Sequence, residues 1–331
     1  MDTLRLFALA QGAVDRLPEP VGRGIFNVVG SVSGMSNMKG SRQLRKNQAR
    51  LRPGMNWMQA RLLSGRAMRS YMRYYYEALR MRSLSHEQIL ARVSEAGTEE
   101  ARKELAAGRS ITGALTHSGN WDLAGAWSNS ALAQVHTIAE KLEPPELYDG
   151  FLAFREGLGM TIYPLVKGGG ALHKLARDME EAPVFTPVLA DRDLSATGIE
   201  VTLAGHVMRV AAGPALLAQR TGVTMYPTFV HYERLHGEHR KKAGCAWGVR
   251  VTLLEGIRAR TTPESPEDER REDLVRMSQE WLSALEPYLM AHLEDWHMLQ
   301  KVFVDDLDPE RLAATRARAA EKVQHLGAEE G

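Results

Sequence analysis

Residues 111–127 have the sequence ITGALTHSGNWDLAGAW, and this stretch decides which fold the chain can adopt. The apolar run 111–116 predicts a buried strand, the glycine-containing segment 117–120 a tight turn, and residues from Trp121 onward a helix. His117 therefore lies at the end of a strand, and Asp122 lies in the first turn of a helix. A carboxylate that folds back onto the imidazole would fix its tautomer and make it a general base.

The spacing of these two residues fits another interpretation equally well. A buried histidine beside a helix-capping aspartate has the same pattern, so the pair alone does not establish chemistry. If the histidine is catalytic, it acts directly on a substrate, because no serine or cysteine follows the pattern of a nucleophile elbow. The simplest step for such a base is to take a proton from a hydroxyl group.

Around this stretch, apolar segments of strand length alternate with segments of helical periodicity. That alternation predicts an α/β fold with a central mixed, mostly parallel sheet flanked by helices. The expected strands lie at 134–138, 161–165, 184–190, 224–232 and 245–254, with a hairpin at 198–210. The expected helices lie at 145–157, 170–181, from Gly213-Pro214 onward and at 266–302, and residues 235–244 are expected to form an exposed loop.

The N-terminal part has a different character. Residues 1–95 are predicted to be mostly helical, with an amphipathic start and a cluster of arginines and lysines between Lys39 and Arg80 that only Glu77 opposes. This region suits an anionic membrane surface, but it also fits helices packed on the domain with a solvated basic face. The predicted organisation is an N-terminal helical region at 1–95, an α/β core at 96–303 and a polar tail at 304–331.

Bulk composition constrains the remaining classes. The formal net charge of the 331-residue chain is +1, so overall charge does not favour a nucleic-acid partner, and the basic segment contains no recognition motif. The single cysteine, Cys245, excludes an intramolecular disulfide. No apolar run is long enough for a transmembrane helix. No histidine or cysteine spacing indicates a metal site, so we expect no metal.

Five further segments, taken together with the histidine pattern, make the sequence resemble a known family. They are FLAFREGLGM at 151–160, LADRDL at 189–194, GIEVTLAG at 198–205, RVAAGPA at 209–215 and EDWH at 294–297. In order and spacing these segments, with residues 116–127, resemble the lysophospholipid acyltransferase superfamily. Within it they are most similar to the branch of lipid A late acyltransferases and actinobacterial phosphatidylinositol mannoside acyltransferases. The resemblance extends from about residue 5 to about residue 303.

The resemblance implies an acyl-CoA-dependent O-acyltransferase without a cofactor. It would move a palmitoyl-type chain to a mannose 6-hydroxyl of phosphatidylinositol mannoside, as a peripheral protein on the cytoplasmic face of the plasma membrane. Another glycolipid acceptor of the lipid A type, or non-catalytic binding of membrane lipid, are the alternatives.

The resemblance also assigns site residues. His117 and Asp122 carry out the proton transfer, and Asp191 lies near the base, although the mannoside enzymes tend to carry the longer glutamate there. Arg155 meets a phosphate. The substrate-binding set is Arg155, Arg192, Ser118 and Asn120. For Arg192, an ion pair with Asp191 or Asp193 is the favoured alternative.

Overall fold

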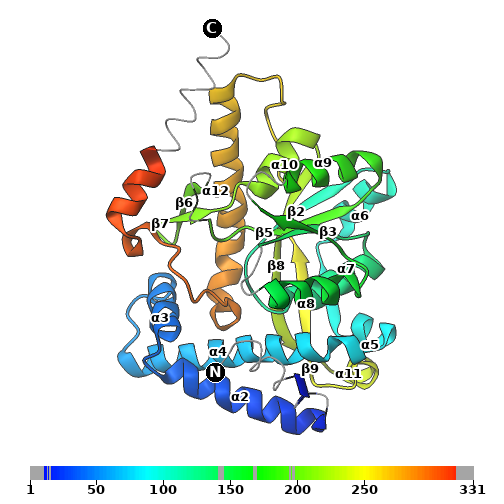
Figure 1. Cartoon of the computed structure of the whole chain (residues 1–331), viewed down its shortest axis with the longest axis vertical. Coiled ribbons are helices and arrows are strands. Elements are labelled where there is room, and N and C mark those ends of the chain that lie inside the picture. The colour runs from blue at the N-terminus through cyan, green and yellow to red at the C-terminus, as the bar shows by residue number, and fades with distance from the viewer. Residues whose placement is uncertain are drawn as a thin grey trace.

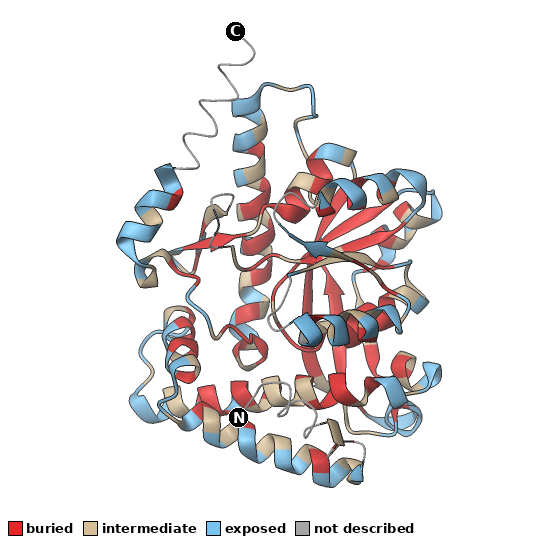
Figure 2. Ribbon diagram, in the orientation of Figure 1, coloured by how far each residue is buried: buried red, intermediate tan, exposed pale blue. Residues whose placement is uncertain are grey.

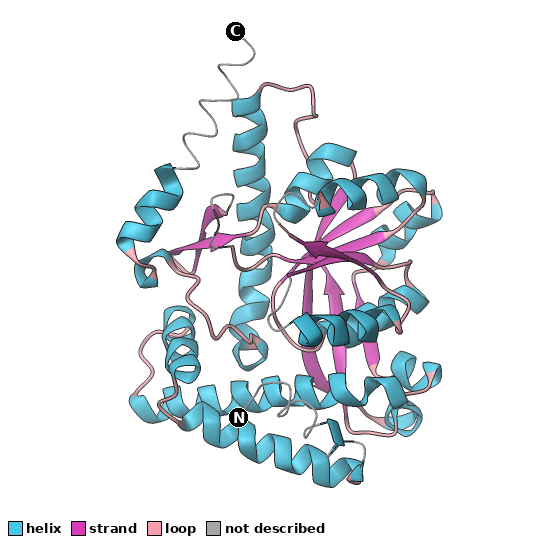
Figure 3. Ribbon diagram, viewed as in Figure 1, coloured by secondary structure: helices cyan, strands magenta, loops and turns pink. Residues whose placement is uncertain are grey.

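The computed structural model describes residues 11, 12, 14, 16–140, 145–166, 170–193, 195 and 198–317. Long helices come first, and strands and helices then alternate (Figures 1 and 3). The helices are α2 (Glu19–Met35), α3 (Lys39–Leu51), α4 (Trp57–Arg80), α5 (His86–Ala91), α6 (Glu99–Ala106), α7 (Trp121–Ala131), α8 (Pro145–Glu156), α9 (Ala171–Glu181), α10 (Gly213–Thr221), α11 (Gly237–Ala243) and α12 (Glu267–Ala291), with short 3-10 turns η1 (Met81–Ser83), η2 (Leu293–Asp295) and η3 (Val304–Asp306). The strands are β1 (Val93–Ala96), β2 (Ile111–Leu115), β3 (His136–Glu140), β4 (Thr161–Leu165), β5 (Phe185–Leu189), β6 (Ile199–Leu203), β7 (His206–Val210), β8 (Thr224–Arg234) and β9 (Trp247–Leu253).

The central sheet has five strands in the order β1-β9-β8-β2-β5. The pairs β1–β9, β8–β2 and β2–β5 are parallel, and only β8–β9 is antiparallel. A parallel pair β3–β4 and an antiparallel hairpin β6–β7 complete the strands. The predicted α/β fold with a mixed, mostly parallel sheet is therefore confirmed, as is the hairpin within 198–210.

Both faces of the central sheet are buried, and the strand sequences show why. Along β8, Met225 and Phe229 pack into the core cluster that contains α12 residues such as Trp281, while Tyr226 and Val230 pack into the cluster on the α7 side. Side chains two residues apart along a strand lie on the same face of the sheet, so alternate residues of β8 pack into two different core clusters, one on each face. Figure 2 shows the strands as almost continuously buried, with helices on either side.

The structure corrects three expectations. The helix expected over 266–302 ends at Ala291, where His292 leaves helical geometry (φ −119°, ψ 42°), and the following residues cross the carboxyl edge of the sheet. The segment 235–244, expected to be a loop, contains α11, whose last turn carries three cations that complement the negative end of the helix dipole. Residues 93–96, inside the region expected to be helical, form the edge strand β1.

Helix α2 lies against α4 and runs antiparallel to it (Figure 1). Glycines allow this close approach: a Cβ on Gly30 would lie 2.6 Å from the Met68 carbonyl oxygen, and one on Gly34 would overlap the Ser64 carbonyl oxygen. No helix in the described part of the chain is long and apolar enough to cross a membrane. Residues 1–10 of the expected amphipathic start lie outside the described residues, and the boundaries after 95 and 303 stay predictions.

The α2–α4 contact predicts opposite outcomes for the same substitution at two positions of α2. Gly34→Ala should lower the free energy of unfolding by about 1–3 kcal/mol, because overpacking forces the two helices apart. Gly24→Ala, whose Cβ would meet nothing within 4 Å, should raise it by up to about 1 kcal/mol through helix propensity. Urea unfolding of both variants measures the difference; equal effects would contradict the packing.

Candidate active site

His117 and Asp191 come together because of the register of two parallel strands. Leu115 of β2 is aligned with Leu189 of β5, so the residues two positions beyond each strand end lie side by side at the carboxyl edge. The Asp191 carboxylate accepts a hydrogen bond from the backbone N–H of His117 (2.9 Å) and lies 2.5 Å from its Nδ1. The shorter acid at this position therefore reaches the imidazole.

The charge state of Asp191 fixes which ring nitrogen of His117 carries the proton. Burial acts to raise the pKa of the Asp191 carboxyl, but attraction to His117 and hydrogen bonds from His117 and Trp296 outweigh it, so the pKa lies below its usual value. An ionised carboxylate only accepts hydrogen bonds, so Nδ1 donates, and in the neutral imidazole the lone pair then lies on Nε2. The His117 side chain is 30% exposed whereas Asp191 is 1% exposed, which leaves a held imidazole with one open edge.

Asp122 does not fill the role that its spacing suggested. Its carboxylate accepts hydrogen bonds from the Tyr74 hydroxyl (2.8 Å) and from Nε of Arg155 (2.7 Å). The expected contact between Asp122 and the imidazole is wrong, because the β2–β5 register places Asp191 there instead. Asp122 acts on the histidine indirectly: Tyr74 packs on Trp121 at 4.1 Å between ring centroids, and Trp121 meets the His117 ring edge-on at 5.6 Å.

The side chains of Ser118 and Asn120 form hydrogen bonds that hold the turn, and substrate binding by these two residues stays a prediction. Both residues are wholly buried. Ser118 Oγ lies 2.8 Å from Thr116 Oγ1, and the Asn120 side chain caps α7 through the N–H of Leu123. The other end of the Asn120 amide donates to the buried carboxylate of Glu77 on α4 (2.9 Å). Gly119 turns the chain here with φ +59°, where a Cβ would lie 2.7 Å from the Val230 carbonyl oxygen.

A C-terminal segment, residues 295–297, closes over the turn; we call it the strap. The backbone N–H of Gly119 donates to the carbonyl of Asp295 (3.0 Å), and that of His297 donates to the carbonyl of His117 (2.8 Å). The indole N–H of Trp296, which is wholly buried, donates to Asp191 Oδ2 (2.8 Å). The EDWH motif at 294–297 was part of the family resemblance, but no residue in it was predicted to lie at the site. Its similarity to the family's end motif was the signal that could have indicated such a role.

The strap brings two buried titratable groups beside the histidine. Burial raises the pKa of Asp295 to about 6, against hydrogen bonds from the Ser70 hydroxyl and the Tyr232 N–H. Burial and the positive charges of His117 and Arg73 lower the pKa of His297 to about 3, so His297 is neutral at pH 7.

The two predicted phosphate-binding arginines both have acidic partners. Arg155, whose side chain is 19% exposed, pairs with Asp122, and Arg192 pairs with Glu140 through Nη2 at 2.9 Å. The ion pair of Arg192 is thus with a residue of β3; an ion pair with Asp191 or Asp193, and phosphate binding by either arginine, stay predictions. Among the described residues, no group of three histidine, cysteine or acidic side chains is placed to hold a metal ion.

Comparison with known proteins identifies the family of the chain. The family described as bacterial lipid A biosynthesis acyltransferase matches residues 4–304. A phosphatidylinositol mannoside acyltransferase from Mycolicibacterium smegmatis is 30% identical over 311 residues, which cover 93% of both chains. One with the same name from Mycobacterium tuberculosis is 31% identical over 314 residues, covering 94% of this chain and 92% of the relative. With a match over nearly its whole length and a histidine held at the carboxyl edge of the sheet, the chain belongs to the bacterial lipid A biosynthesis acyltransferase family.

Proposed function

We propose that the protein transfers a long-chain acyl group from acyl-CoA to a mannose 6-hydroxyl of phosphatidylinositol mannoside, with His117 as the general base. One observation carries the proposal: Asp191 holds Nδ1 of a partly exposed imidazole, so Nε2 is free to accept a proton. The names of the relatives support the mannoside acceptor. The family description supports a second candidate, a glycolipid acceptor of the lipid A type.

The proposed reaction is one direct transfer. Nε2 of His117 takes the proton of the acceptor hydroxyl as its oxygen attacks the thioester carbonyl. The tetrahedral intermediate collapses with cleavage of the carbon–sulfur bond, and the thiolate receives the proton from the imidazolium. The products are the ester and free CoA. Ser118 and Ser70, the serines beside the histidine, are buried and hydrogen-bonded, which supports a route without an acyl-enzyme.

The same turn offers donors for the developing oxyanion. Of the backbone N–H groups from 118 to 121, those of Ser118 and Gly119 are bonded to the carbonyls of Thr116 and Asp295. Those of Asn120 and Trp121, at the start of α7, have no acceptor among the described residues. Free N–H groups at the positive end of a helix dipole stabilise negative charge, so we assign the oxyanion to this position.

We also propose that the protein works at the cytoplasmic face of the plasma membrane as a peripheral protein. Of the fifteen exposed large apolar side chains among the described residues, ten lie between residues 21 and 62. On α2 they recur at helical spacing, with Val28 64% and Val32 65% exposed, and Trp57 at the start of α4 is 70% exposed. An amphipathic helix with an aromatic anchor is typical of proteins that lie in the membrane interface.

The histidine–aspartate pair predicts graded losses of acyl transfer. His117→Ala should abolish CoA release, and Asp191→Asn should lower kcat about 10²–10⁴-fold, because the amide can no longer hold Nδ1–H and stabilise the imidazolium. Asp191→Glu, the acid typical of the mannoside enzymes, should retain much more activity than Asp191→Asn. Thiol release from palmitoyl-CoA measures all three; full activity of His117→Ala in a folded protein would refute the mechanism.

The acceptor predicts which lipid accumulates when the gene is deleted. Phosphatidylinositol mannosides lacking the mannose-linked acyl chain should build up, and mass spectrometry of the lipids measures them. A purified protein that releases CoA with a lipid A precursor but not with the mannoside would instead favour the second candidate. No CoA release with either acceptor would favour a non-catalytic lipid-binding protein.

If α2 lies in the membrane interface, one added negative charge should weaken membrane binding when it is placed on α2 but not when it is placed on α12. Val32→Asp on α2 should weaken binding to vesicles containing phosphatidylglycerol at least tenfold, because a buried valine contributes about 1.5 kcal/mol or more and the new charge is repelled. Val275→Asp, a control at an exposed helix position of α12 (42% exposed), should bind as the unchanged protein does. Vesicle flotation compares them; equal binding by both variants would contradict the assignment.

A further inference from the structure

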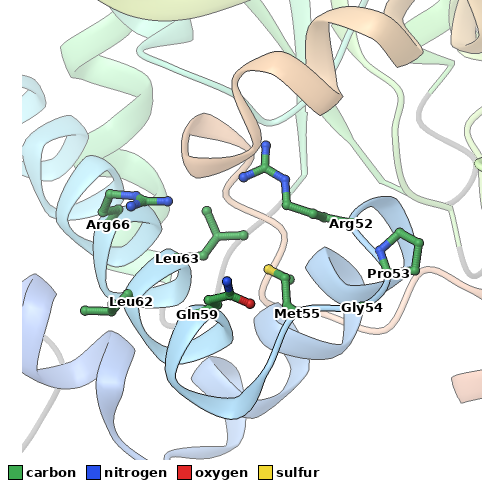
Figure 4. Close-up of a pocket in the computed structure, with 8 residues that line it drawn as sticks. All are labelled: Arg52, Pro53, Gly54, Met55, Gln59, Leu62, Leu63 and Arg66. Carbon is green, nitrogen blue, oxygen red and sulfur yellow. The ribbon is translucent and has the colours of Figure 1, made fainter.

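A cavity of about 410 Å³ lies away from the turn that carries His117, between the loop joining α3 to α4 and the first turns of α4 (Figure 4). Its apolar wall comes from Met55, Leu62 and Leu63, and Arg52 and Arg66 lie at opposite sides of it. None of its eight lining residues is acidic. The cavity therefore combines an apolar surface with two positive charges.

These two charges are not neutralised by the protein. Arg52 donates Nη2 to the carbonyl of Met290 in the last turn of α12 (3.1 Å), and no ion pair of Arg52 or Arg66 with a described residue is present. Arg69 and Arg73 follow Arg66 at three- and four-residue steps, on the same side of α4. Arg69 forms no ion pair within the described residues, whereas the Arg73 guanidinium is partly buried, lies 3.7 Å from the Trp247 ring centroid and is attracted by the carboxylates of Glu77 and Asp295. Arg52, Arg66 and Arg69 therefore create the local positive potential that an anion would stabilise.

The apolar residues around the cavity indicate where that anion comes from. Leu62, which lines the cavity, is 48% exposed, and Met58, one turn before it on α4, is 53% exposed. A soluble phosphate would gain nothing from these side chains. A phospholipid would place its phosphate on the guanidinium groups, which match phosphate geometry, and its glycerol and first methylenes on the apolar wall.

We propose that this cavity binds the phosphate of an anionic membrane phospholipid, as a lipid site separate from the catalytic turn. Eight residues separate Arg66 from Tyr74, which is about 12 Å along α4 at 1.5 Å per residue. A lipid held at Arg52 and Arg66 would thus fix the same helix that contributes Ser70 and Tyr74 to the surroundings of His117. The bound lipid orients the enzyme on the membrane and is not consumed.

The test uses a lipid that dissolves as a monomer, so that binding is not confused with general attraction to a charged surface. Dihexanoyl phosphatidylglycerol, titrated into the full-length protein by calorimetry below its critical micelle concentration, should bind in a saturable 1:1 complex. Arg66→Gln should weaken this binding about fivefold, and Arg52→Gln/Arg66→Gln about 30-fold, since each cation near an anionic lipid contributes about 1 kcal/mol. Arg177→Gln/Lys241→Gln, which removes two exposed cations from α9 and α11, is the matched control and should bind normally.

Two further titrations identify the ligand. Dihexanoyl phosphatidylcholine should bind more weakly than the glycerol lipid, and inorganic phosphate should bind at least tenfold more weakly. Equal affinity for inorganic phosphate would overturn the assignment to a lipid, and unsaturable binding, or equal loss in the control, would overturn the site. Because Arg52→Gln also removes a hydrogen bond to α12, Arg66→Gln alone keeps the test valid if the double variant unfolds. CoA release from a detergent-dispersed acceptor should be unchanged in Arg66→Gln, which separates this site from the catalytic proposal.

Discussion

The parallel register between β2 and β5 is the constraint on which the site depends. It places the residues two positions beyond Leu115 and Leu189 next to each other, and these are His117 and Asp191. A one-residue shift would move the carboxylate to the other face of the sheet and leave a buried charge unpaired. The pair is thus specified by strand pairing, which the whole core stabilises, and only secondarily by the turn that carries the histidine. Catalytic geometry and fold stability come from the same hydrogen bonds.

The strap adds a second level of support to the same pair. Its backbone forms hydrogen bonds with the backbone of both His117 and Gly119. The indole N–H of Trp296 donates to Asp191 Oδ2, which also accepts from the backbone N–H of His117. A buried carboxylate that accepts several hydrogen bonds stays ionised, and this keeps Nδ1 of the imidazole protonated and Nε2 available. A segment that lies about 180 residues beyond the histidine in sequence therefore determines its tautomer.

How far the sequence predicts this arrangement depends on the range of each interaction. The alternation of strands and helices, the hairpin and the strand–turn–helix at 111–127 follow from local pattern, and they were predictable. Local pattern alone did not identify the partner of His117, because Asp122 is near in sequence whereas Asp191 becomes near only through β2–β5 pairing; it was the family resemblance that placed Asp191 near the base. The burial of the Ser118 and Asn120 side chains was not predictable either, because it depends on the packing of the turn against α4 and the strap.

Helix α4 links the part of the protein that carries most of the exposed apolar side chains to the surroundings of His117. It packs closely along α2 through glycines, carries Arg66 beside the cavity, and sends Ser70, Tyr74 and Glu77 toward the strap, Asp122 and Asn120. A 24-residue helix behaves as a rigid rod, so a displacement at its N-terminal end reaches Tyr74 and the Trp121 ring that it contacts. The distance of the imidazole from a surface that holds α2 and α4 is therefore set by one continuous element and does not depend on a flexible linker. The hydroxyl of a lipid acceptor would lie at a fixed height above the membrane surface. The imidazole must then lie at a matching distance from that surface, because proton transfer to Nε2 takes place only within hydrogen-bond distance.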